Sequence, residues 1–156
     1  MALREIRIEG DEILGKVSKE VLTVTPRIKQ LILDMFETMD ANDGIGLAAV
    51  QVGTLRRIIV INIEQEDKKT RMALINPNII EESGKELGLE GCLSIPNFRG
   101  KVYRPTKLKV SYRDENFEEK VLEAEGLMAR CLCHEIDHLN GILFDQITVE
   151  EDDTTD

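Results

Sequence analysis

The sequence has no apolar run near the roughly 18 residues that a membrane span requires. Residues 1–12, MALREIRIEGDE, hold no apolar stretch of the kind found in a secretory signal peptide. Both absences argue against a membrane protein and favour a cytoplasmic one. Internal repeats and linkers are absent too, so residues 1–149 are expected to form a single domain.

Basic residues are too few to balance the acidic ones. The chain has 20 Lys and Arg against 30 Asp and Glu, which gives a formal net charge of −10. Phosphate contacts need clustered Lys and Arg, so nucleic acid is disfavoured as a direct partner. The final segment, EEDDTTD (150–156), is expected to be an acidic disordered tail.

Cysteine and histidine are scarce. The three cysteines, Cys92, Cys131 and Cys133, are an odd number in a compartment expected to be reducing, which favours metal binding or simple burial over disulfides. The two histidines, His134 and His138, both lie in CLCHEIDHLNG (131–141).

Helical signals stand at both ends of the chain. Thr25 is a good N-cap and Pro26 suits the first helical position, and apolar residues then recur every three or four positions as far as Met39. A second such period follows Gly126, and Gly141 suits its C-terminal end. The sequence therefore predicts a long amphipathic N-terminal helix and a C-terminal helix that carries HEIDH.

The middle of the chain has the alternation and the β-branched residues of strands. Four segments are predicted to be strands: 56–63, 72–80, 101–113 and 117–126. The residues RDEN between the last two segments are of types that favour turns, which indicates an antiparallel hairpin. The expected fold class is α+β, with antiparallel β-sheets wrapped around the C-terminal helix and the long N-terminal helix packed outside.

HEIDH is the pattern of a metal hydrolase. Positions i and i+4 share one face of a helix, so His134 and His138 can hold one ion, and Glu135 beside them can carry a proton without being a ligand. Two histidines packed on a helix would give the same bare pattern. A third ligand is therefore needed to separate the two interpretations.

The usual third ligands of zinc proteases are missing. In HExxHxxGxxH enzymes a third histidine follows, but Phe144 occupies that position here, and the residues after it resemble a strand and a tail. Upstream, Cys92 lies in LEGCLSIPNFRG, an irregular Gly/Ser/Pro segment where the backbone can approach a ligand. One Cys and two His leave a fourth position for water, as in catalytic sites. Cys133 points about 100° away from His134 on a helix, so it is not expected to share the ion.

Three segments resemble the motifs of the peptide deformylase family. They are GIGLAAVQ (44–51), EGCLS (90–94) and HEIDHLNG (134–141), in that family's order and at roughly its spacing. The similarity runs from Ile6 to Phe144. Cys133 is a departure, because the family usually has Gln there. GIGLAAVQVG also resembles a phosphate loop, but it lacks the Lys of GxxxxGK[ST], so nucleotide binding is disfavoured.

The resemblance implies a metal-dependent hydrolase that removes the formyl group from the N-terminal formyl-methionine of nascent polypeptides and releases formate. It implies Cys92, His134 and His138 as metal ligands. Glu135 would take a proton from water and hand one to the leaving amine. The Gln51 side chain and the Leu93 backbone N–H would donate hydrogen bonds to the developing oxyanion.

Substrate contacts follow from the same resemblance. Ile45, Gly46 and Gly91 would bind the extended peptide backbone by strand addition. The methionine pocket would be lined by Ile45, Leu127, Arg130, Cys131 and His134. Arg130 is unexpected in such a wall; we expect its stem to cover the rim while the guanidinium reaches solvent. Glu90, Arg104 and Asp137 would form a charged group that holds the metal loop against the helix.

Only the resemblance to the family indicates which metal ion and which partners the protein binds. Cys and His ligands alone suit zinc, whereas the family implies one Fe²⁺ per chain, with Ni²⁺, Co²⁺ or Zn²⁺ as substitutes. The expected partners are nascent formyl-methionyl chains, with transient proximity to the ribosome, and a monomeric state is expected. Two rival functions remain, a non-catalytic relic with a structural Cys-His-His metal site and a metalloprotease.

Overall fold

The structure is a computed structural model and describes residues 2–149. The predicted acidic tail, 150–156, lies outside the described residues. The helical elements are α1 (Pro26–Ala41), α2 (Leu127–Leu139) and the 3-10 turns η1 (Glu12–Gly15), η2 (Ala49–Val52) and η3 (Phe144–Gln146). The strands are β1 (Gly46–Ala48), β2 (Ile58–Gln65), β3 (Lys68–Ser83), β4 (Glu86–Cys92), β5 (Ile95–Arg104), β6 (Lys107–Arg113) and β7 (Glu119–Glu125).

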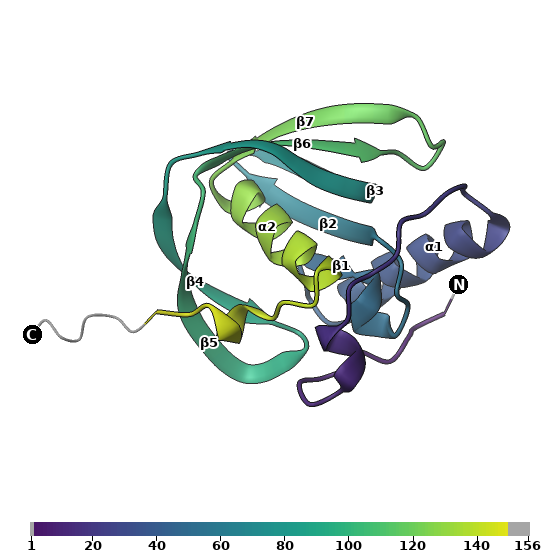
Figure 1. The fold of residues 1–156 in the computed structure, drawn as a ribbon, viewed down its shortest axis with the longest axis horizontal. Coiled ribbons are helices and arrows are strands. Elements are labelled where there is room, and N and C mark those ends of the chain that lie inside the picture. Colours follow the sequence, from purple (N-terminus) through teal and green to yellow (C-terminus); the bar gives the residue numbers. More distant parts are fainter. Residues whose placement is uncertain (1, 150–156) are drawn as a thin grey trace, which may run out of the picture.

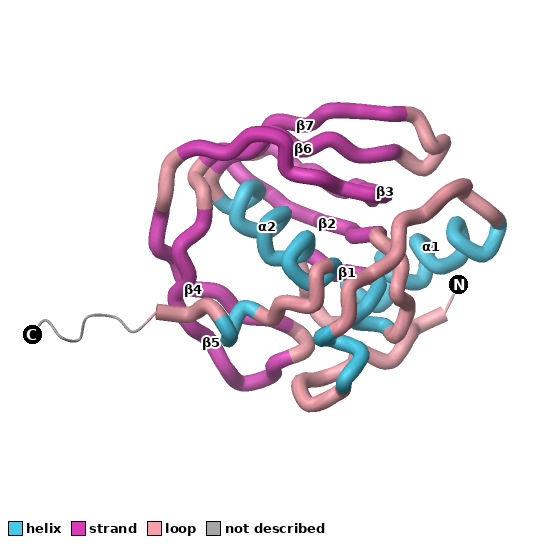
Figure 2. The backbone as a smooth tube through the Cα atoms, viewed as in Figure 1, coloured by secondary structure: helices cyan, strands magenta, loops and turns pink. Residues whose placement is uncertain are grey.

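The strands form two antiparallel sheets. The larger has five strands in the order β1-β2-β3-β6-β7, and the smaller is the two-stranded β4–β5 ribbon. Strand β3 is long enough to pair with β2 along its first half and with β6 along its second, and the register shifts near Asn78 and Glu81 bend it. Helices combined with antiparallel sheets confirm the expected class (Figure 2).

Helix α2 lies between the five-stranded sheet and the β4–β5 ribbon (Figure 1). Strand β2 explains how the sheet holds a helix on each face, because successive side chains of a strand point to opposite sides. Ile59, Ile61 and Ile63 belong to the core that includes the apolar side of α2. Ile58 and Val60 point the other way, into a second core with α1.

The helix ends follow their capping chemistry. The Thr25 hydroxyl accepts a hydrogen bond from the Ile28 amide at 3.2 Å, and Pro26 opens α1. Helix α2 ends at Leu139 with Asn140 as its C-cap, and Gly141 follows with a φ of 78°. A Cβ at Gly141 would lie 2.5 Å from the Gly15 carbonyl oxygen, so glycine is required there by conformation and by packing.

Three sequence-based expectations about strands were wrong. The residues that follow α2 form no strand among those described; Phe144–Gln146 is the 3-10 turn η3. Residues 101–113 are not one strand but parts of β5 and β6, which belong to different sheets. Pro105 lies at the break, where its missing N–H cannot pair. The Gly/Ser/Pro segment around Cys92 is not irregular either; it forms the β4–β5 hairpin, with a register shift between Gly91 and Cys92.

Candidate metal centre and active site

Helix α2 presents both histidines on one buried face. The rings of His134 and His138 lie 4.9 Å apart between centroids, in an edge-on arrangement. His138 is fully buried, and its Nδ1 has no hydrogen-bond partner among residues 2–149. Burial lowers the pKa of His138 well below its ordinary value. A neutral imidazole with free lone pairs is the form of histidine that binds metal ions.

Cys92 joins the two histidines from the turn of the β4–β5 ribbon. Its Sγ lies 3.4 Å from Nε2 of His138, and ligand atoms of Cys92, His134 and His138 all lie within 4.8 Å of one another. Bonds of about 2.3 Å to sulfur and 2.0–2.1 Å to nitrogen place tetrahedral ligands roughly 3.5 Å apart. The three residues therefore fit one ion, and they are the one such group in the described part of the chain.

Glu90 orients the metal-binding face. Its Oε1 lies 2.9 Å from Nδ1 of His134, and Arg104 binds both of its carboxylate oxygens at 2.8 Å. Arg104 also donates to Asp137 at 2.6 Å, so Glu90, Arg104 and the partly exposed Asp137 form one network. Burial opposes charge on Glu90, but the hydrogen bonds from Arg104 and His134 prevail and lower its pKa to about 2. An ionised Glu90 accepts the proton on Nδ1 of His134, so Nε2 is the ring atom that can face an ion.

Glu135 is buried beside this group but lies outside it. Burial raises the pKa of its carboxyl to about 7. Its Oε1 has no hydrogen-bond partner among residues 2–149. Gly46 of β1 allows the approach, because a Cβ there would lie 2.6 Å from Oε2 of Glu135 and 2.8 Å from Sγ of Cys131. A carboxyl that titrates near neutrality can both accept and return a proton.

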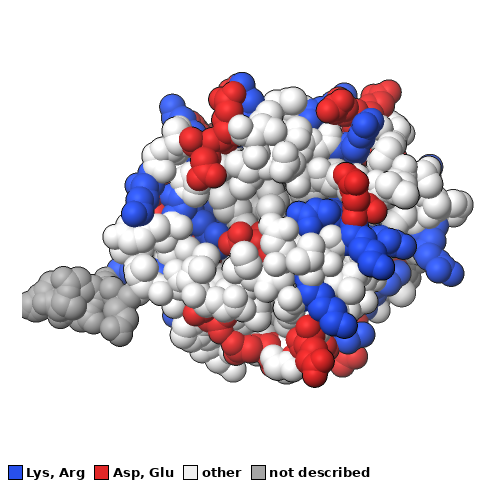
Figure 3. Space-filling model, viewed as in Figure 1, with Lys and Arg blue, Asp and Glu red and all other residues white. Residues whose placement is uncertain are grey.

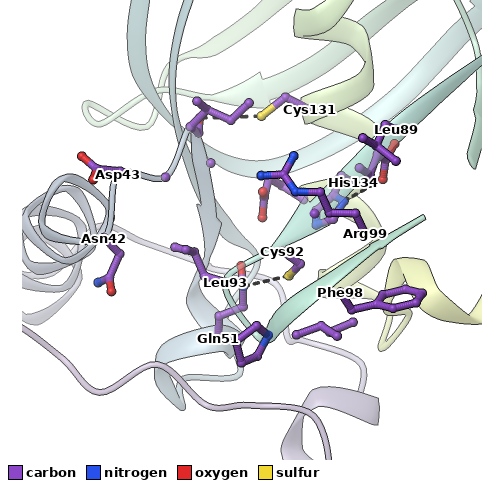
Figure 4. A pocket seen from close by; sticks show the side chains of 18 of the residues that line it. Asn42, Asp43, Gln51, Leu89, Cys92, Leu93, Phe98, Arg99, Cys131 and His134 are labelled. Carbon is purple, nitrogen blue, oxygen red and sulfur yellow. Dashed lines mark hydrogen bonds and ion pairs between the residues drawn. The ribbon is translucent and has the colours of Figure 1, made fainter. Parts of the chain in front are cut away.

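Gln51 brings an amide donor to the same place. Its Oε1 accepts from the Ala48 amide at 2.9 Å, which fixes which end of the side chain points inward. Its Nε2 donates to the Ser94 hydroxyl at 3.0 Å and lies 3.5 Å from Sγ of Cys92 (Figure 4). Leu93 lies between Cys92 and Ser94 in the turn of the ribbon. Ser94 was missed by sequence reasoning, because a lone Ser in a turn carries no signal of such a partner.

A cleft of about 910 Å³ opens onto these groups. Figure 4 shows Cys92, Gln51 and His134 together in it, with Phe98 and Arg99 of β5 beside them. All the residues expected to contact substrate line this cleft: Ile45, Gly46, Gly91, Leu127, Arg130 and Cys131. Sequence reasoning missed several further lining residues, Asn42, Asp43, Leu89, Phe98 and Arg99 among them.

Arg130 departs from its expected conformation. Its guanidinium does not reach solvent: it binds Oε2 of Glu90 at 2.8 Å and the Val102 carbonyl at 3.0 Å, and its side chain is only 13% exposed. The expectation failed because a buried carboxylate and free strand carbonyls offer the guanidinium better partners than water at the rim. These partners are at least 28 residues away in the chain, so the local sequence does not reveal them.

None of the helices within residues 2–149 combines the length and apolarity needed to cross a membrane.

Comparison with known proteins agrees with the geometry of the site. The family model for polypeptide deformylase matches residues 3–152. A peptide deformylase of Agathobacter rectalis is 51% identical over 144 residues, covering 92% of this chain and 89% of that protein.

Two further matches extend the likeness. Peptide deformylase 1 of Clostridium acetobutylicum is 53% identical over 144 residues, covering 92% of this chain and 93% of that protein. The crystal structure of peptide deformylase from Ehrlichia chaffeensis in complex with actinonin is similar with a TM-score of 0.92 and 42% identity, covering 96% of this chain and 91% of that one. The family model, the relatives and the solved structure all match along nearly the whole chain, which belongs to the polypeptide deformylase family.

Proposed function

We propose that this protein removes the formyl group from the N-terminal formyl-methionine of nascent polypeptides and releases formate. The observation that carries the proposal is the placement of Cys92, His134 and His138 within 4.8 Å of one another, next to the buried carboxyl of Glu135, at the base of an open cleft. A purely structural metal site would need neither the cleft nor a fourth, titratable group.

The residues divide the reaction between them. Cys92, His134 and His138 would hold an ion, which supplies Lewis acidity and acidifies water when bound. Glu135 accepts the proton of the attacking water and passes a proton to the amine nitrogen as the C–N bond breaks. The side-chain N–H of Gln51 and the backbone N–H of Leu93 donate to the oxygen of the formyl group as negative charge develops on it.

The substrate would bind as an extra strand. Among the strands of residues 2–149, β1 pairs with β2 alone, so its other edge is open. Gly46, the first residue of β1, and Ile45 just before it both line the cleft. Gly91 lines the cleft from the ribbon. An extended peptide between them gains backbone hydrogen bonds from both sides. Its methionine side chain would enter between Leu127 and Cys131 on α2, with the stem of Arg130 nearby.

The remaining assignments belong to the same proposal. Helix α2 would act as the central helix of a single catalytic domain, residues 1–149, with α1 as outer support. The ion would be Fe²⁺, with Ni²⁺, Co²⁺ or Zn²⁺ as substitutes, since ligand type alone does not select among them. The protein would work in the cytoplasm as a monomer, in transient proximity to the ribosome.

The test is formate release from a formyl-methionyl tripeptide by protein purified without oxygen, with the metal content measured on the same sample. We expect stoichiometric formate and an intact, deformylated peptide. Internal cleavage of the peptide would indicate a metalloprotease instead, and bound metal without formate would indicate a structural relic. Comparison of Fe²⁺, Ni²⁺ and Zn²⁺ forms in air, with mass spectrometry of Cys92, tests the metal: iron activity should decay as the thiolate oxidises, and nickel activity should persist.

A further inference from the structure

The metal-binding group is divided between two separate elements. Cys92 belongs to the β4–β5 ribbon, whereas His134 and His138 belong to α2, and the ribbon is not hydrogen-bonded into the five-stranded sheet. The distance between the thiolate and the imidazoles therefore depends on how the ribbon docks on α2. Whatever fixes that docking also fixes the ligand geometry.

Besides the contact of Cys92 with His138, three side chains of α2 bind side chains or carbonyls of the ribbon within residues 2–149. Two of them are His134, which contacts Glu90, and Asp137, which contacts Arg104. The third is Arg130, which lies one turn before His134. It is the link that also reaches the backbone of both ribbon strands.

The guanidinium of Arg130 has four acceptors on the ribbon. Nη1 donates to the carboxylate of Glu90 at 2.8 Å and to the carbonyls of Val102 at 3.0 Å and Gly88 at 3.5 Å. Nη2 donates to the carbonyl of Glu86 at 2.9 Å. Because the side chain is only 13% exposed, these charge-assisted bonds are weakly screened by water. A flat, five-donor group can bridge two strands in this way, and a lysine ammonium cannot.

The absence of a side chain at Gly88 leaves room for this contact. A Cβ at Gly88 would lie 2.7 Å from Cζ and Nη2 of Arg130, so any side chain there would push the guanidinium away. The backbone of Gly88 is outside the left-handed region, so alanine is conformationally acceptable at this position. The two residues thus form a matched pair across the joint between helix and ribbon.

We infer that Arg130 is a positioning residue that docks the β4–β5 ribbon on α2 and so sets the separation of Cys92 from His134 and His138. The inference rests on the proposed metal site. Arg130 touches neither the ion nor the reacting atoms. It acts through Glu90, which also orients His134, and through the strand that leads to Cys92.

The test is a titration of the metal-free Arg130→Met variant with Co²⁺. Binding is monitored by the absorption band that arises when a Cys thiolate binds Co²⁺. Methionine keeps the length of the stem and removes the donors. We expect the affinity for Co²⁺ to fall on the order of tenfold or more, as when other groups that orient ligands are lost, with an altered Co²⁺ spectrum. Arg130→Lys should recover only part of the affinity. Arg71→Met is the matched control, since it removes an exposed bidentate ion pair with Asp40 remote from the site.

Gly88→Ala gives an independent arm, because it displaces the guanidinium while leaving Arg130 in place. We expect it to weaken Co²⁺ binding as Arg130→Met does, and we expect the double variant Gly88→Ala/Arg130→Met to bind Co²⁺ no more weakly than Arg130→Met alone. Additive losses would overturn the inference. So would wild-type affinity and spectrum in Arg130→Met, even if that variant melts at a lower temperature. Formate release by the wild-type sample is measured alongside and reports on the proposed function separately.

Discussion

Glu135 combines three properties that a proton carrier needs: it is buried, it has an oxygen without a protein partner, and its pKa is raised by burial to about 7. It is not one of the three residues whose ligand atoms cluster. We therefore expect Glu135→Gln to keep the metal content of the wild type while turnover falls on the order of 10²–10⁴-fold. Metal analysis and formate release on one sample provide the measurement.

His138→Ala serves as the comparison for Glu135→Gln, because it should lose metal and activity together. If Glu135→Gln also lost its metal, the carboxyl would be a ligand, contrary to the roles proposed here. Full activity of the variant would show that another group moves the proton.

Gln51 is held so that its amide nitrogen, not its oxygen, faces the thiolate. Gln51→Glu keeps the acceptor for the Ala48 amide and removes the donor. We expect kcat to fall on the order of 10²–10³, the usual cost of one oxyanion donor, with little change in KM. Ser94→Ala removes only the hydroxyl that accepts from this amide, so its loss should be smaller. An equal loss in both variants would mean that Gln51 serves only to support the turn.

At the scale of elements, α1 is tied to the start of the chain by Asp34. This buried carboxylate accepts from the Ala2 amide at 2.8 Å, from Nε of Arg4 at 2.9 Å and from Gln30 at 2.8 Å. We expect Asp34→Ala to lower the free energy of unfolding by about 1–3 kcal/mol at pH 7, because partly buried donors lose their acceptor. Denaturant unfolding, with activity as a control for the site, provides the measurement.

The contribution of Asp34 should depend on pH in one direction. Burial raises its pKa, but the hydrogen bonds from Gln30, Ala2 and Arg4 outweigh burial and hold the pKa below the ordinary value. A carboxyl whose pKa is lower in the folded state than in the unfolded state stabilises the fold. That contribution is complete at a pH above the unfolded-state pKa, about 3.9, and it is lost as the pH falls through the folded-state pKa. The gap between wild type and Asp34→Ala should therefore narrow below about pH 4. A gap that widens with acid would contradict this reading.

Elements with a strong local signal could be predicted from the sequence, and those decided by distant partners could not. The N-cap Thr25, the apolar period of α1 and the Gly141 stop are local features, and each has the conformation expected of it. The separation of β5 from β6 depends on which sheet each strand joins, and Pro105 was the only local sign of it.

The same contrast holds within the site. HEIDH fixes the spacing of its own side chains on a helix, so the facing of His134 and His138 is a local property. Cys92 could be nominated only by elimination and by resemblance, because a ribbon and a helix must meet before it is near the histidines. The contacts of Arg130 with the ribbon and of Gln51 with Ser94 span more than 25 residues and have no sequence pattern of their own.

At the scale of the whole molecule, the acidic balance of the sequence, with 30 Asp and Glu against 20 Lys and Arg, is the main feature of its charge. On the face that Figure 3 shows, Lys and Arg are interspersed with Asp and Glu. The segment 150–156 adds five acidic residues and no Cys or His. We expect deletion of residues 151–156 to leave kcat/KM for a formyl-methionyl tripeptide unchanged. A large loss would mean that this segment takes part in the site.

The divided ligand set, with Cys92 on the ribbon and His134 and His138 on the helix, has a consequence for the lifetime of the protein. The unfolded chain holds the thiol and the imidazoles more than 40 residues apart, so an ion binds the native state in strong preference to it. By mass action, free metal at 100 times its dissociation constant adds about 2.7 kcal/mol to the stability of the fold. A cell short of the metal would then lose both the activity and part of the protein itself, because proteases remove chains that open more often.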